Sequence, residues 1–244
     1  RPTESVLGCP WDPVEDTLGV RAIEVKDLER VTKRLVVSTV ARLFDPLGLA
    51  APFALQAKLL VQKIWTLGLG WDEQLRDEER RFWDVWVAEL RKLRDLVVPR
   101  CLHLSRGDGE MQHEVHIFCD ASELAFGTVA YLRTQRDGGV DVGFIAAKTR
   151  VAPLKQISIV RLELQAAVMA TRLAEAISRE LTYEVHRTVF WSDSCVVLQY
   201  LNNESRRFHT FVANRVAEIR ESSEPSQWKK VPTDLNPADV CSRG

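Results

Sequence analysis

An apolar run that ends in a carboxylate limits the folds open to this chain more than any other segment. The run His116-Ile117-Phe118-Cys119-Asp120 alternates with the two-residue period of a strand, and Ala121-Ser122 then turns the chain back. This period places Asp120 on the same face of the strand as Phe118 and His116. Because an Asp after an apolar run is usually a turn or capping residue, Asp120 alone does not identify a site.

The segments after this run predict a mixed sheet. Residues 115–120, 126–132 and 143–150 have strand patterns, and the turn signal Asp137-Gly138-Gly139 joins the last two in an antiparallel meander. A helix over 160–177 then leads to a strand over 189–193, a connection that implies parallel pairing. The order ends with helices near 194–201 and 208–221 and a strand near 228–231. The prediction is an α/β fold with a five-stranded mixed sheet covered by helices on both faces.

Three further carboxylates stand at defined places in this order. Glu163 lies in the crossover helix, on one face with Ala167, Ala170 and Ala174, whose small side chains let that face approach a sheet. Asp193 closes the apolar run that precedes the next helix. Asp239 follows Asn236 and Pro237, which suit an N-cap and a first helical position. A surface Glu, a capping Asp and an Asp that complements a helix dipole are the structural alternatives.

Four short motifs carry these carboxylates and resemble a known family. They are Phe118-Cys119-Asp120-Ala121-Ser122, Arg161-Leu162-Glu163-Leu164, Trp191-Ser192-Asp193-Ser194 and Asn236-Pro237-Ala238-Asp239. Together they resemble the Asp-Glu-Asp-Asp signature of ribonuclease H domains. The C-terminal run from Asn236 to Gly244 is similar to the Pao/BEL group of long-terminal-repeat retrotransposons in particular. The resemblance covers about residues 113–244 and extends less specifically upstream.

The resemblance implies an endonuclease that hydrolyses the RNA strand of RNA–DNA hybrids during reverse transcription. All four carboxylates would be catalytic and would bind two Mg²⁺ ions, with Mn²⁺ as an alternative. Asp120 would bridge both ions and Asp239 would help hold the one that activates water, while Glu163 and Asp193 would hold the one facing the leaving 3′ oxygen. Clustered carboxylates without His or Cys independently favour Mg²⁺ or Mn²⁺ over zinc.

Candidate substrate contacts and two departures from the family pattern complete the site. The candidates are Ser122, Ser194, Arg206 and Arg207, although local capping explains the two serines equally well. Many ribonucleases H carry a histidine before the final Asp, and residues 228–239 contain none. The basic handle of some cellular members is also missing, because only residues 202–208 join the two helices. We therefore expect slower turnover and hybrid affinity supplied from elsewhere.

The first hundred residues predict a mainly helical region without a reactive constellation. Val6–Trp11 and Thr17–Val20 suggest a hairpin, and helices are expected over 28–43, from 52 to 64, and along a stripe from Leu75 to Leu93. This half resembles the thumb and connection of a reverse transcriptase, but the paired polymerase aspartates are absent. The predicted organisation is 1–100 thumb/connection-like, 101–113 linker and 114–244 ribonuclease H-like. Five basic residues in and just before the first helix could contact phosphate or form a solvated face: Lys26, Arg30, Lys33, Arg34 and Arg42.

Charge and cysteine content limit the partners and the compartment. The 33 basic and 34 acidic residues create no net positive field, so charge alone does not indicate nucleic acid. Five scattered cysteines without CxxC spacing favour reduced thiols inside a cell. No membrane span or signal peptide is expected. By resemblance the partners are the hybrid and the polymerase part of a polyprotein, in a cytoplasmic virus-like particle with access to the nucleus.

Two other functional classes are compatible with this fold. A domesticated, non-catalytic module would use it only to bind nucleic acid or protein, and absence of divalent-metal binding would support that alternative. Integrase-type transferases share the fold and the metals, but their glutamate comes last in the chain, whereas Glu163 stands second. The order of the carboxylates therefore favours the nuclease.

Overall fold

The computed structural model describes residues 4–6, 8–21, 23–25, 29–102, 111–136, 139–203 and 207–244. The chain divides into two compact units. Unit 1 comprises Arg1–Arg100 together with Gly244, and unit 2 comprises Cys101–Arg243. Most of the predicted linker, residues 103–110, lies outside the described residues.

Unit 1 combines a small antiparallel sheet with three helices. The strands, in sheet order, are β1 (Glu4–Val6), β2 (Cys9–Asp12), β3 (Thr17–Gly19) and β4 (Val97–Pro99). The helices are α1 (Lys33–Arg42), α2 (Ala51–Thr66), α3 (Asp77–Leu90) and the 3-10 helix η1 (Arg91–Asp95). The expected hairpin corresponds to β2 and β3, in which Trp11 pairs with Leu18. The flanking strands were not predicted, because three residues are too few to show a period.

Two helix predictions in unit 1 need correction. The first helix begins at Lys33 and not near residue 28, because Thr32 ends the preceding extended segment and its Oγ1 accepts a 3.4 Å bond from Leu35 N–H. The third apolar stripe spans α3 and η1, with Leu75 before the helix. Phe82 is 42% exposed and does not share the buried face. Trp83 and Trp86 fill the core of the unit instead, and Trp86 stacks on Phe53 at 4.9 Å between centroids.

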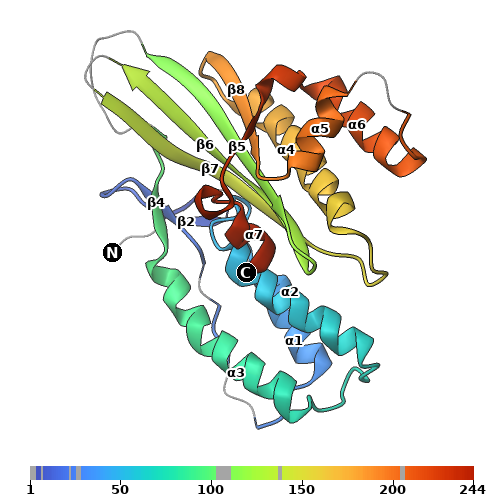
Figure 1. Ribbon diagram of the computed structural model, residues 1–244. Coiled ribbons are helices and arrows are strands. Elements are labelled where there is room, and N and C mark those ends of the chain that lie inside the picture. Colours follow the sequence, from blue (N-terminus) through green and yellow to red (C-terminus); the bar gives the residue numbers. More distant parts are fainter. Residues whose placement is uncertain are drawn as a thin grey trace. The chain divides into compact units, whose positions relative to one another are not determined.

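Unit 2 contains the predicted mixed sheet (Figure 1). Its strand order is β7-β6-β5-β8-β9, with bounds β5 (Gln112–Ala121), β6 (Ala125–Arg136), β7 (Gly139–Val151), β8 (Val185–Ser192) and β9 (Trp228–Lys230). β5, β6 and β7 form the antiparallel meander, and β8 pairs in parallel with β5 and with β9. The Asp137-Gly138 part of the predicted turn lies outside the described residues.

The long helix of unit 2 covers one face of this sheet. The helices are α4 (Ile159–Glu180), α5 (Cys195–Asn202), α6 (Thr210–Ser222) and α7 (Asp239–Arg243), with 3-10 helices η2 (Pro225–Gln227) and η3 (Thr233–Leu235). The small face of α4 lies against β5 and β6, as the spacing predicts, and Ala167 and Ala170 are fully buried there. Ile117 and Phe190 complete the core from the sheet side.

The opposite face of the sheet carries α7. Asp120 pairs with Gly127 across β5 and β6, so both residues share this face, and a Cβ added at Gly127 would lie 2.6 Å from the Cβ of Cys241 in α7. A glycine is therefore required for this close approach. Beside α7 the same face carries partly buried aromatic rings, including Phe118 stacked on Trp191 at 5.8 Å. Helices thus lie on both faces of the sheet, but α7, which lies on the second face, is short.

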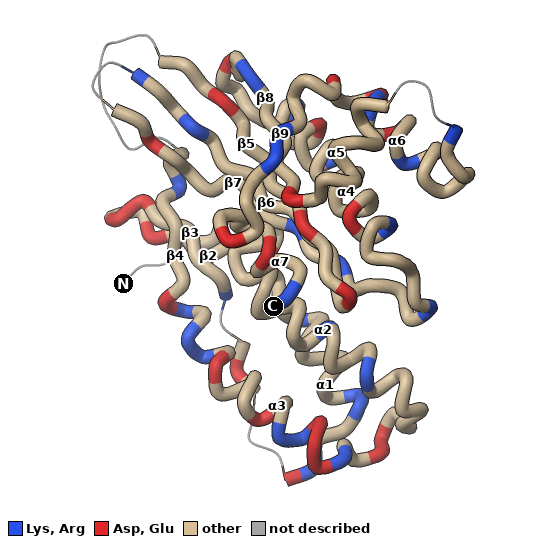
Figure 2. Tube along the Cα trace, viewed as in Figure 1, with Lys and Arg blue, Asp and Glu red and all other residues tan. Residues whose placement is uncertain are grey.

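No described helix has the length and apolar character needed to cross a membrane. Acidic and basic residues are interspersed along the trace of both units (Figure 2).

Candidate active site

The strand register brings two of the predicted carboxylates to one edge of the sheet. In the parallel pair of β5 and β8, Cys119 lies opposite Ser192. Asp120 and Asp193 are the next residues of the two segments, so both lie at the carboxyl ends of neighbouring parallel strands. Open sheets bind ligands beyond these ends.

Asp120 is the most enclosed of the four carboxylates. It is 8% exposed, and its Oδ2 accepts a hydrogen bond from the Ser242 hydroxyl of α7. The pKa of Asp120 is raised to about 6. Burial is the largest cause, the Ser242 bond lowers the pKa, and the negative charges of Asp193 and Asp239 raise it. Because the charges of Asp193 and Asp239 both affect the pKa of Asp120, these three carboxylates share one electrostatic neighbourhood.

Glu163 reaches the same edge from the first turns of α4. Its Oε2 accepts a 2.7 Å hydrogen bond from the hydroxyl of Ser194, which also caps α5 by accepting from Val197 N–H at 3.2 Å. Burial, and then the charge of Asp193, raises the pKa of Glu163. Asp193 is thus near both Glu163 and Asp120.

The C-terminal segment supplies the fourth carboxylate. Asn236 Oδ1 accepts from Ala238 N–H at 3.1 Å, and Asn236 Nδ2 donates to Cys119 O at 3.2 Å, so this residue fastens the start of α7 to β5. Asp239 then falls in the first turn of α7, as its sequence context predicts. Its Oδ1 accepts a 2.6 Å bond from Arg243 Nε. Asp193 is held in the same manner, because its Oδ2 accepts from Thr233 Oγ1 at 2.8 Å.

The donor chemistry of this cluster fits a hard divalent cation. Carboxylates that raise one another's pKa lose that repulsion when a cation binds between them, and oxygen-only donors suit Mg²⁺ or Mn²⁺. Each carboxylate is bonded to a donor of the chain itself, however, and the described residues contain no group of three His, Cys, Asp or Glu placed to hold a metal ion. Metal binding would therefore require these side chains to exchange partners.

A family comparison covers three of the four carboxylates. The model of the Pao retrotransposon-like RNaseH-like domain matches residues 32–194, which is more than half of the chain and includes Asp120, Glu163 and Asp193. The chain belongs to this family. The match ends before Asp239, so the role of that residue rests on the geometry of α7. A search of curated proteins finds no match.

The fold of this Pao-type chain is similar to that of a solved reverse transcriptase structure. A foamy viral protease-reverse transcriptase (dRH) in complex with double-stranded DNA has a TM-score of 0.53 at 16% identity, over 97% of this chain and 38% of that chain. Two others are the N-terminal RNase H domain of a Mycobacterium tuberculosis protein, fused to maltose-binding protein (TM-score 0.38, 16% identity, 54% and 91% covered), and LC11-RNase H1 in complex with RNA/DNA hybrid (0.35, 12%, 51% and 91%). The fold is RNase H-like.

The four predicted substrate contacts of this Pao-type domain have different settings. Ser122 and Ser194 lie beside the carboxylates, but each hydroxyl is engaged in local bonds, Ser122 with Leu124 N–H at 3.1 Å and Ser194 with Glu163. Arg206 lies outside the described residues. Arg207 is exposed in the segment before α6, which Figure 1 shows well away from α7. The structure therefore brings the serines to the site but not Arg207.

Three polar residues of the site were missed by the sequence analysis. Ser242, Thr233 and Arg243 each donate to a site carboxylate. Only Arg243 had a sequence signal, because it lies four residues after Asp239 in a helix, the spacing of a salt bridge. Thr233 and Ser242 meet carboxylates 40 and 122 residues away, which local spacing cannot show.

The cysteines beside the carboxylates are structural. Cys119 is buried in the core, and burial raises the pKa of its thiol. Burial likewise raises the pKa of Cys241 to about 12, with a contribution from the charge of Asp120. Neither thiol is available as a thiolate near neutral pH. No disulfide joins any of the five cysteines, all of which lie in the described residues.

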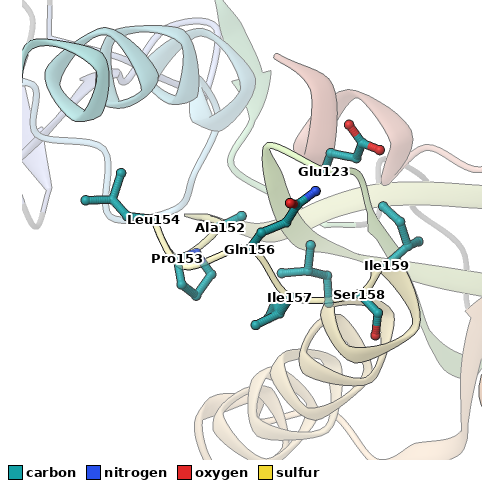
Figure 3. A pocket seen from close by; sticks show the side chains of 9 residues that line it. Glu123, Ala152, Pro153, Leu154, Gln156, Ile157, Ser158 and Ile159 are labelled. Carbon is teal, nitrogen blue, oxygen red and sulfur yellow. The ribbon is translucent and has the colours of Figure 1, made fainter. Parts of the chain in front are cut away.

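A hollow of about 290 Å³ lies next to the start of α4. Its lining comes from the turn after β5 and from the segment that enters α4: Glu123, Ala152, Pro153, Leu154, Gln156, Ile157, Ser158, Ile159 and Leu162. Figure 3 shows the Gln156 amide and the Glu123 carboxylate among otherwise mainly apolar side chains. None of the four site carboxylates lines this hollow.

Proposed function

We propose that this chain is an endonuclease that hydrolyses the RNA strand of RNA–DNA hybrids during reverse transcription of its retroelement. The observation that carries the proposal is the shared electrostatic neighbourhood of Asp120, Asp193 and Asp239, with Glu163 beside Asp193. Such a cluster is costly unless cations neutralise it, so a function that uses divalent metal accounts for its presence.

Each carboxylate has a role that its position supports. Two bound Mg²⁺ or Mn²⁺ ions would supply activation of a water and stabilisation of the departing oxygen of a phosphodiester. Asp120, whose pKa is affected by the charges of both Asp193 and Asp239, would help hold both ions. Asp239 would help hold the ion on the side of the attacking water, and Glu163 and Asp193 would hold the ion on the side of the leaving 3′ oxygen.

Substrate recognition rests on shape more than on charge. An RNA–DNA hybrid has an A-like form and exposes 2′-hydroxyls, which small polar and backbone groups can contact without reading bases. Ser122 and Ser194 lie next to the carboxylates and are candidates once their local bonds exchange. Arg206 and Arg207 supply phosphate contacts further from the cluster, and the polymerase part of the polyprotein supplies the remaining affinity.

Unit 1 has a supporting role in this proposal. Its helices and small sheet correspond to the thumb and connection region of a reverse transcriptase and guide the hybrid toward unit 2. The protein then acts within a polyprotein-derived complex in a cytoplasmic virus-like particle.

One observation favours the alternative of a non-catalytic binding module. All four carboxylates are satisfied by donors of the chain, and no described group of three is ready to hold a metal. A module that only binds nucleic acid or protein would keep these bonds permanently. The nuclease must exchange them for metal, so divalent-metal binding separates the two functions.

The test compares four labelled substrates under the same conditions. We expect cleavage of the RNA strand in an RNA–DNA hybrid with Mg²⁺ or Mn²⁺ and none with EDTA. Duplex DNA, duplex RNA and the DNA strand of the hybrid remain intact. A folded protein that binds the hybrid but leaves it uncut with both metals would support the binding module.

A further inference from the structure

Ser242 contacts two of the site carboxylate residues from a fully buried position. Its side chain is 0% exposed, and its Oγ donates to Asp120 Oδ2 and lies 3.0 Å from the backbone oxygen of Asp239. A serine hydroxyl has one proton, and a hydrogen bond to an ionised carboxylate is stronger than one to a carbonyl. The proton is therefore directed to Asp120 when that carboxylate is charged.

The backbone of Ser242 is held in place by a second hydroxyl. Ser122 Oγ donates a 2.6 Å hydrogen bond to Ser242 O. Ser122 Oγ also accepts hydrogen bonds from Leu124 N–H at 3.1 Å and from Ala125 N–H at 3.2 Å, in the turn after β5. Because these bonds use the proton and both lone pairs of the Ser122 hydroxyl, its direction is fixed by the turn.

The contact between α7 and β6 leaves little room for movement. A Cβ at Gly127 would lie 2.6 Å from the Cβ and 2.9 Å from the backbone oxygen of Cys241, so the helix rests directly on the strand. Ser242 follows Cys241 and is enclosed by the same packing. The direction of its hydroxyl is consequently set by the fold and not by solvent.

We propose that Ser242 is a positioning residue for Asp120, and that Ser122 holds Ser242 in place. The inference rests on the proposed metal-dependent function of Asp120. The Ser242 hydroxyl engages Oδ2 and so sets the rotation of the carboxylate before a cation arrives. A buried carboxylate without this donor would adopt several rotations, and only some of them would suit metal binding. Ser122 then acts through α7, and direct contact with substrate is not its main role.

If Ser242 had only a structural role, its removal should act like the removal of any other buried serine. The chain offers such a serine as a matched control. Ser223 is also buried, donates to Ile219 O at 2.7 Å and accepts from Trp228 Nε1 at 2.9 Å, but it faces no site carboxylate. Ser223→Ala therefore removes another buried hydroxyl with two partners. A change in Mn²⁺ binding that comes from a general loss of stability would appear in both Ser242→Ala and Ser223→Ala.

The experiment titrates the full chain with Mn²⁺ and follows free Mn²⁺ by electron paramagnetic resonance. We expect Ser242→Ala to weaken Mn²⁺ binding by roughly tenfold, within the range found when an outer-sphere partner is removed. Ser122→Ala weakens it by a smaller factor, and the double variant is no worse than Ser242→Ala alone. Ser223→Ala leaves the Mn²⁺ affinity unchanged. In hybrid cleavage, kcat falls in Ser242→Ala while KM for the hybrid stays constant.

The outcomes separate this inference from the proposed function. If wild-type protein binds no Mn²⁺, the metal-dependent function fails and the positioning role fails with it. If wild type and Ser242→Ala bind Mn²⁺ equally, the positioning role is overturned while the nuclease proposal stands. Circular dichroism checks the fold of each variant. Should Ser242→Ala not fold, unchanged Mn²⁺ affinity in Ser122→Ala would overturn the proposal by itself.

Discussion

Cys119 and Ser192 face each other across the parallel strands β5 and β8. This single register places the following residues, Asp120 and Asp193, at one edge of the sheet. A shift of one residue would turn Asp120 to the α4 side and Cys119 to the other. The buried position of Cys119 therefore fixes the position of the catalytic candidates.

The raised pKa of Asp120 predicts a pH-dependent penalty in metal-free protein. With a folded-state pKa of about 6 against an ordinary value of 3.8, folding favours the protonated form. Stability is therefore full below about pH 4 and falls as the pH rises through 6, by at most ~3 kcal/mol at ~1.4 kcal/mol per pKa unit. In EDTA, Asp120→Asn should raise the free energy of unfolding at pH 7.5 by about 1–3 kcal/mol and change it little at pH 4.

Urea unfolding at the two pH values measures this difference. Equal effects of the substitution at pH 4 and pH 7.5 would mean that Asp120 is not destabilised by burial and by its neighbours. Asp77→Asn, an exposed first-turn residue of α3, is the matched control.

The sequence patterns predicted those parts of the fold that depend on local residue spacing. The strand before Asp120, the small face of α4 and the Asn-Pro start before Asp239 all depend on neighbours within a few residues, where side-chain period and capping chemistry operate. The short strand β4 could not be predicted, because its pairing with β3 joins residues about eighty positions apart. The Ser242 bond to Asp120 was hidden for the same reason.

Burial of a charged residue was another feature that composition could not show. The sequence analysis assigned Lys33 to a phosphate contact or to a solvated face, and its burial shows that the solvated face is wrong. Lys33 is buried, its Nζ donates to Leu69 O at 3.0 Å, and it lies 3.3 Å from the ring centroid of Trp65. A buried lysine whose ammonium group contacts an aromatic ring and a backbone carbonyl is part of the core.

Lys33→Met should therefore affect stability and not hybrid binding. The variant loses the cation–π contact and the bond to Leu69 O, so we expect the free energy of unfolding to fall by about 1–3 kcal/mol. Hybrid affinity by fluorescence anisotropy should stay the same at constant salt. A weaker hybrid affinity with a smaller salt dependence would show that Lys33 contacts phosphate.

Gly127 gives a steric test of how α7 docks. Gly127→Ala places a methyl group 2.6 Å from the Cβ of Cys241 and 3.0 Å from Lys148 O, and backbone atoms cannot yield as a flexible side chain would. Overpacking of this kind costs about 1–3 kcal/mol. We expect lower stability together with weaker Mn²⁺ binding, because Asp239 and Ser242 move with α7. Gly139→Ala is the control, since open space surrounds that position. Retained Mn²⁺ affinity in Gly127→Ala would show that α7 is not required for the metal.

Ser194 joins a helix cap to a site carboxylate, and the two roles can be separated. Ser194→Ala removes the cap of α5 and the donor to Glu163, so we expect a loss of about 1 kcal/mol in unfolding free energy and a lower cleavage rate. Ser194→Asp restores a capping acceptor but repels Glu163. Denaturation measures the capping role of Ser194, and the cleavage rate measures the role of its bond to Glu163. If Ser194→Asp recovered the rate as well as the stability, the bond to Glu163 would have no part in activity.

The central claim is that the carboxylate cluster performs metal-dependent cleavage of the RNA strand. The most direct test is the cleavage rate of a labelled RNA–DNA hybrid by wild type, Asp193→Asn and the control Asp77→Asn, each with Mg²⁺ and with Mn²⁺. We predict that Asp77→Asn cleaves like wild type and that Asp193→Asn is slower by more than about a hundredfold, equivalent to ~2.7 kcal/mol in the barrier. Wild-type rates in Asp193→Asn would contradict the assignment and would trace the cleavage to a contaminating nuclease.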